Sequence, residues 1–145
     1  MKRLIVSLAF VIGLAAAATP AVAQQAGNVR VAFQGPGGHS SGAYGRVSAL
    51  HAAARAVILM QKALPAGSYQ ITNLTGGNSV NSIASDGLIE LRLNAASAAA
   101  YQALVAAVTK AAAEGAAAEN AFRGVKAGDL TSGAPATVRS VVTPF

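Results

Sequence analysis

The chain has 145 residues, with 11 basic and 5 acidic side chains, a formal net charge of +6 and no cysteine. This length allows one small domain with a single core, and the lack of cysteine excludes disulfides and a cysteine-ligated metal. The basic side chains are scattered, without the runs and interleaved aromatics of a nucleic-acid surface, so nucleic acid is not an expected partner.

The first 23 residues have the pattern of a secretory signal peptide. Basic residues 2–3 precede an apolar run of about fifteen residues, and the small triplet Ala-Val-Ala at 21–23 precedes Gln24. Thr19 and Pro20 interrupt the run before it reaches the ~20 apolar residues that a membrane span requires. We therefore expect cleavage after Ala23, a periplasmic or secreted location, no membrane attachment after cleavage, and one domain over residues 24–145.

Two predicted elements surround a glycine-dense loop, GPGGHSSGAYG, at residues 35–45. Residues 28–34 alternate strictly, with Val29, Val31 and Phe33 on one face, which predicts a half-buried strand. Residues 44–64 predict a helix that Pro65 and Gly67 end. Its expected apolar stripe consists of Val47, Leu50, Ala54, Val57, Ile58 and Leu64.

The second half of the chain predicts two strands, a helix and a last strand. Residues 68–74 and the alternating residues 88–93 are expected to pair as antiparallel strands. Ser97 is the expected cap of a helix that runs to the glycine at 115 or slightly beyond. Its expected stripe is Tyr101, Leu104, Val105, Val108 and Ala112. The last strand is either 121–126 or 136–142, and the second is favoured because it is longer and richer in β-branched residues.

The order of these elements is β-α-β-β-α-β. With right-handed crossovers, this order predicts an α+β, ferredoxin-like fold in which a four-stranded antiparallel sheet carries two helices on one face. The other face of the sheet would present polar side chains, namely Arg30, Gln34, Glu90 and Arg92.

The glycine-dense loop does not match the common motifs that bind nucleotides or metals. It has no lysine for a phosphate-binding loop, and Ser40 stands where a dinucleotide fingerprint needs its third glycine. The chain has no H-x-x-x-H or H-x-D spacing for zinc, and no evident acid orients His39 toward the adjacent serines. His39 could simply bond neighbouring backbone groups in the turn, and His51 is expected to be a packed or partly exposed helix residue.

Four segments taken together carry a family resemblance. VAFQGPGGHSSGAYG, the helix with SALHAAARAV, and the later TGGNSVNSIASD and IELRL resemble the dimerisation (lid) domain of the M20 family of zinc metallopeptidases. The resemblance covers about residues 28–115. This family includes aminoacylases, carboxypeptidases and succinyl-diaminopimelate desuccinylase.

The resemblance implies substrate-binding roles for His39, Asn81 and Arg92. His39 matches the lid histidine, which reaches the active site of the partner subunit and stabilises the oxyanion at the scissile carbonyl. Asn81 matches an asparagine that contacts substrate, and Arg92 an arginine that in some members binds the substrate carboxylate. The residues alone also allow plainer roles, because Asn81 suits a turn and Arg92 could pair with Glu90 or a cross-strand neighbour.

The chain also departs from the family pattern. It lacks the H-x-D, the bridging aspartate, the paired glutamates and the final histidine that hold zinc, and Ala84 stands where a proline is usual. We expect no metal or cofactor on this chain, and no catalysis by it alone; zinc would belong only to a hypothetical catalytic partner. The leading hypothesis is an exported, stand-alone module that forms a homodimer.

Two alternatives stay open. The chain could be the lid fragment of a split or truncated zinc-dependent peptidase or amidohydrolase, completing a catalytic domain encoded elsewhere. It could also be a module that binds a small ligand, an amino acid or a peptide, through His39, Asn81 and Arg92.

Overall fold

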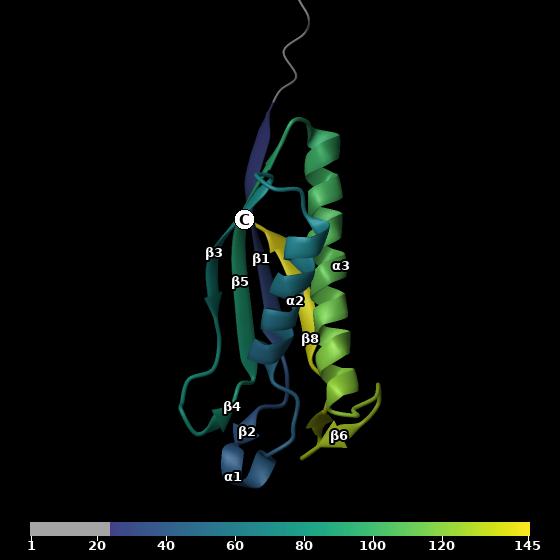
Figure 1. Ribbon diagram of the computed structural model, residues 1–145. Coiled ribbons are helices and arrows are strands. Elements are labelled where there is room, and N and C mark those ends of the chain that lie inside the picture. Colours follow the sequence, from purple (N-terminus) through teal and green to yellow (C-terminus); the bar gives the residue numbers. More distant parts are fainter. Residues whose placement is uncertain (1–23) are drawn as a thin grey trace, which may run out of the picture.

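The computed structural model describes residues 24–145, so the predicted signal peptide at 1–23 lies outside the described residues (Figure 1). Its centre is a four-stranded antiparallel sheet in the order β3-β5-β1-β8, and two long helices, α2 and α3, lie against one face. The predicted ferredoxin-like α+β fold is confirmed. The sheet strands are β1 (Gln25–Gln34), β3 (Tyr69–Thr75), β5 (Asp86–Ala95) and β8 (Arg139–Pro144), and the helices are α2 (Ala49–Ala63) and α3 (Ala98–Phe122).

Five short elements lie outside this layer pair. The two-residue strands β2 and β4 pair with each other, as do β6 and β7, and the single-turn helix α1 follows β2. Their bounds are β2 (Gly38–His39), α1 (Ser40–Ala43), β4 (Ser82–Ile83), β6 (Leu130–Thr131) and β7 (Ala134–Pro135).

The alternation of the two central strands positions the core. Val29 lies opposite Leu91 and Val31 opposite Ile89, and all four side chains are buried beneath the helices. The opposite face carries the expected polar side chains, including an ion pair between Arg30 Nη2 and Glu90 Oε1 at 2.8 Å. The sheet therefore has one buried face and one polar face.

The predicted first helix begins later than expected, at Ala49. Ser48 is its N-cap, with its side-chain oxygen accepting a hydrogen bond from the backbone N–H of His51, whereas Gly45 has a positive φ of 89° that a helix does not allow. Residues 44–48 therefore form the connection between α1 and α2.

The apolar stripe predicted for this helix is partly wrong. Val47 and Leu64 are buried, but Leu50 and Val57 are only half-buried, and Ala54 and Ile58 are exposed. The core side of α2 consists instead of small residues and one methionine, namely Ala49, Ala52, Ala53, Ala56 and Met60.

Close contact between the two helices explains why small residues occupy the buried side of α2. Gly115 of α3 lies so close to α2 that a Cβ added there would come within 2.7 Å of Ala56 N and 2.8 Å of Ala52 O. At this separation only small side chains fit opposite Gly115, so alanines occupy positions 52 and 56 of α2.

The second long helix continues beyond its predicted end. Gly115 serves helix packing rather than termination, and α3 ends at Phe122, two residues before Gly124, whose φ is +69°. The alternative strand at 121–126 is therefore wrong. The predicted strand at 136–142 is shifted to Arg139–Pro144, because the side chain of Asn120 bonds both backbone polar groups of Val138.

Among residues 24–145, none of the helices is both long and apolar enough to cross a bilayer.

Candidate functional site

The glycine-dense loop and the loop at 76–85 meet at one end of the sheet. His39 of β2 lies opposite Ser82 of β4, and the backbone N–H of Ser40 donates to the carbonyl of Asn81 at 2.9 Å. The first loop follows β1, which ends at Gln34, and the second leads into the paired strand β5, which begins at Asp86 opposite Gln34. The pairing of the central strands therefore brings the two predicted motifs together.

His39 and Asn81 are in direct contact. Asn81 Nδ2 lies 3.0 Å from His39 Nε2, and Ser41 Oγ lies 2.8 Å from His39 Nδ1. Ser79 Oγ donates in turn to Asn81 Oδ1. These contacts orient an exposed imidazole ring, and its Nε2 would have to exchange the Asn81 contact before it could bond a group on another molecule.

Arg92, by contrast, lies far from this pair. It is exposed on the polar face of β5, opposite Asn28 and Gln70 in the neighbouring strands. Arg92 lies six positions along the extended strand from Asp86, a distance of ~20 Å. The chain brings His39 and Asn81 together but not Arg92.

The glycine before His39 accommodates an arginine that the sequence analysis did not single out. Gly38 has a φ of +144°, and a Cβ there would come within 2.5 Å of Ala43 Cβ and 3.0 Å of Arg46 Nη1. Arg46 Nη1 donates to the carbonyl of Gly37 at 3.1 Å. This turn of the loop therefore holds the Arg46 guanidinium in place.

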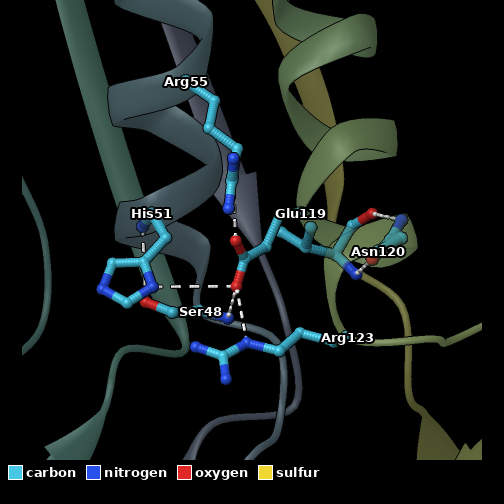
Figure 2. Close-up of polar contacts among 7 residues, drawn as sticks. Ser48, His51, Arg55, Glu119, Asn120 and Arg123 are labelled. Carbon is cyan, nitrogen blue, oxygen red and sulfur yellow. Dashed lines mark hydrogen bonds and ion pairs between the residues drawn. The ribbon is translucent and has the colours of Figure 1, made fainter.

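Behind the loops, the carboxylate of Glu119 is buried between the two helices (Figure 2). Its Oε1 accepts from the backbone N–H of Ser48 at 3.2 Å and from Arg123 Nε at 3.3 Å. Its Oε2 accepts from Arg55 Nε at 3.0 Å, and His51 Nδ1 lies 3.7 Å from Oε1. The dipole of α2 also stabilises a negative charge at this position, close to the N-terminus of the helix.

Two opposing effects act on the pKa of Glu119. Burial raises this pKa, but the hydrogen bonds from the Ser48 N–H, Arg55 and Arg123, together with the charge of His51, lower it by more. The result is a carboxylate whose pKa is below its ordinary value of 4.5, so that it is ionised at neutral pH.

Phe122 completes the surroundings of this ion cluster. The guanidinium carbons of Arg55 and Arg123 each lie 4.9 Å from the centre of its ring, within the range of cation–π contact. The sequence contained a signal for the cluster, because Val108, Ala112, Gly115 and Glu119 continue one helical stripe. The expectation that the helix ends near 115 hid that signal.

Among residues 24–145, no three His, Cys, Asp or Glu side chains come close enough together to hold a metal ion.

Comparison with protein families supplies one match. A family model described as a peptidase dimerisation domain matches residues 24–120. A search of curated proteins found no match.

Solved structures with the same fold include peptidases and an amidase. A tripeptidase from Staphylococcus aureus has a TM-score of 0.63 at 17% identity, covering 84% of this chain and 29% of its own. Aminopeptidase PepT from Bacillus cereus has a TM-score of 0.62 at 19% identity, with coverages of 84% and 29%. A hydantoinase/carbamoylase family amidase from Burkholderia ambifaria has a TM-score of 0.60 at 20% identity, with coverages of 84% and 28%. The chain thus spans less than a third of the length of these proteins, and at these identities the likeness shows the fold alone.

The buried carboxylate leads to a prediction about stability. We expect Glu119→Gln to lower the free energy of unfolding at pH 7 by about 1–3 kcal/mol, because an amide leaves the donors of Arg55, Arg123 and Ser48 less well matched. The folded pKa of Glu119 is lowered, so its contribution is complete above 4.5 and is lost as the pH falls through the folded pKa. Urea unfolding at pH 7 and at successively lower pH should show the difference between the two proteins shrinking.

Glu114→Gln is the matched control. Glu114 pairs with Lys110 on the exposed side of the same helix, so its loss should change the unfolding free energy by less than about 0.5 kcal/mol. Equal effects of the two variants, or a difference that does not change with pH, would contradict the role assigned to Glu119.

Proposed function

The chain belongs to the peptidase dimerisation domain family of the M20 metallopeptidases, and on that premise we propose that it is a self-association module that forms a homodimer. The proposed interface consists of the edge strand β3 and the adjoining outward side of α2. We propose that the module is not catalytic by itself.

The observation that carries this proposal is the orientation of α2. Arg55 and Leu59 lie on the side of the helix toward α3, since Arg55 bonds Glu119 and Leu59 lines a hollow with α3 residues. Ala54 and Val57 are on the opposite side by helical periodicity, toward β3, and Ile58 points outward with 52% exposure. A short apolar strip therefore runs beside the open edge of the sheet.

An open edge and an apolar strip can be covered together by a second copy. Within residues 24–145, strand β3 pairs only with β5, so its outer side presents unpaired backbone N–H and C=O groups, and Leu74 on it is 44% exposed. A two-fold axis beside this edge would bring β3 against β3 and the α2 strip against its own copy. Both features would then be buried by one self-complementary contact.

A substitution on α2 tests this interface. We expect the chain to sediment as a dimer at tens of micromolar, and Ile58→Glu to convert it to a monomer, because the contact would place two like charges in an apolar surface. Val141→Glu is the control, since Val141 is 59% exposed on β8, the other edge strand. A monomeric parent chain, or a dimer that only Val141→Glu dissociates, would contradict the proposal.

We also propose that the chain is exported and cleaved after Ala23, on the evidence of the charge and hydropathy pattern at its start. Expression in a Gram-negative host, with fractionation and N-terminal sequencing, should give a periplasmic or secreted product that starts at Gln24. A cytoplasmic product that retains Met1 would contradict this location.

The contact between His39 and Asn81 favours a second candidate function, in which the chain completes a catalytic domain on a separate polypeptide. Two of the three residues that the family resemblance assigns to substrate, His39 and Asn81, are already hydrogen-bonded to each other and exposed. In this proposal His39 stabilises the developing oxyanion and Asn81 contacts substrate, while the partner holds the zinc. Arg92, ~20 Å from the loops, would bind a carboxylate at a separate point of contact.

An assay of amide hydrolysis tests both candidate functions. With zinc or cobalt, the purified chain alone is expected to leave N-acyl amino acids and dipeptides uncleaved. If the second candidate holds, adding an isolated M20 catalytic domain should raise the activity of that domain, and His39→Gln should reduce the gain by about 10²–10³-fold while the chain stays folded. Metal-dependent turnover by the chain alone would contradict both candidates, and an unchanged gain with His39→Gln would contradict the second.

A further inference from the structure

A hollow of about 480 Å³ opens at the N-terminal end of α2. Three segments that are distant in the sequence form it: residues 46–51 at the start of α2, the loop at 76–84, and Arg123 just after α3. Its volume lies in the range of ~300–1,000 Å³ that is typical of small-molecule sites. Neither the family resemblance nor the proposed dimer assigns a role to this hollow.

The charged side chains that line the hollow are basic. Arg46, His51 and Arg123 face it, and no Asp or Glu is among the lining residues of the described chain. Glu119 lies behind the wall, fully buried, with both of its oxygens bonded to donors of the protein. Its one charge is shared by Arg55 and Arg123, so with Arg46 the region keeps an excess of positive charge.

The two arginines are held in place yet keep unused donors. Arg123 is anchored through Nε to Glu119, and its terminal nitrogens point away from that carboxylate and find no hydrogen-bond partner within residues 24–145 (Figure 2). The guanidinium of Arg46 is fixed against the glycine-dense loop, and its bonds go to the neutral oxygens of Gly37 and Ser132. Guanidinium groups that are held in place with donors left over are well suited to bind oxyanions.

The rest of the wall limits what can accompany the anion. Leu50, Val80 and Ile83 contribute apolar surface, and Asn78 and Ser79 add short polar side chains. Val80 is fully exposed, and Leu50 and Ile83 are half-buried, so each has apolar surface that a ligand could cover. A ligand with a charged end and a short apolar end would use both kinds of wall.

We propose that this hollow binds a small oxyanion-bearing molecule, a carboxylate or a phosphate, with Arg46 and Arg123 as its principal ligands and with the ligand's short apolar part against Leu50 and Val80. His51 adds a donor at the mouth of the hollow. The bound anion connects the start of α2, the 76–84 loop and the end of α3. This binding does not require the proposed dimer, and it can be measured on the chain in either oligomeric state.

Calorimetric titration of the purified chain with butyrate and, separately, with inorganic phosphate tests the proposal at constant ionic strength. We expect saturable binding of at least one anion, and saturation by butyrate alone or phosphate alone identifies which oxyanion the hollow prefers. Arg46→Gln should weaken this binding about tenfold or more, because it removes one charged ligand. Arg139→Gln, which removes an equal charge on the exposed side of β8, should leave the affinity within about twofold.

A second variant keeps the test decisive if Arg46→Gln fails to fold. Asn78→Asp adds a negative charge inside the hollow with almost no change of shape, and an aspartate can still accept the hydrogen bond from Ser82 Oγ. It should also weaken binding about tenfold or more, whereas Asn28→Asp, at an exposed position of β1, should not. Failure of both anions to saturate at millimolar concentration would overturn the proposal, as would equal weakening by each variant and its control.

Discussion

A carboxylate that is buried away from water must be matched by hydrogen-bond donors. Glu119 finds its donors on α2, at the N-cap of α2 and directly after the end of α3. The Ser48 N–H, Arg55 and Arg123 converge on its two oxygens. This convergence fixes where α2 begins relative to where α3 ends. Because Arg46 precedes Ser48 by two residues and bonds the glycine-dense loop, the position of that loop depends on the same carboxylate.

Close helix packing also positions the side chains on which the proposed dimer depends. Gly115 allows α3 to approach the backbone of α2 at Ala52 and Ala56. Ile58 and the half-buried Val57 remain away from this contact, next to the edge of the sheet. A helix that buried them would leave no apolar strip beside β3, so the proposed self-association follows from the alanine-rich contact.

The two proposed surfaces occupy different parts of the fold. The strip on α2 and the edge of β3 run along the side of the sheet, whereas the His39–Asn81 pair and the basic hollow lie at the end where β1 finishes and β5 begins. In peptidases and an amidase with the same fold, the part that matches this chain makes up only 28–29% of the protein's length. In the proposed dimer, the chain would pair along one side while its end remains available to a ligand or a partner.

The sequence by itself determined the number, type and order of the sheet strands and long helices, because alternation and helical periodicity reflect local backbone geometry. It also determined the glycine-dense loop and the asparagine-containing loop, since both are continuous in the chain. Only the tertiary structure decided which side of α2 is buried, because two stripes of similar period compete and the distance between helices selects the smaller side chains. The same holds for Glu119, Arg123 and Arg46, and for the separation of Arg92 from His39: each depends on contacts between residues far apart in the sequence, which no local pattern records.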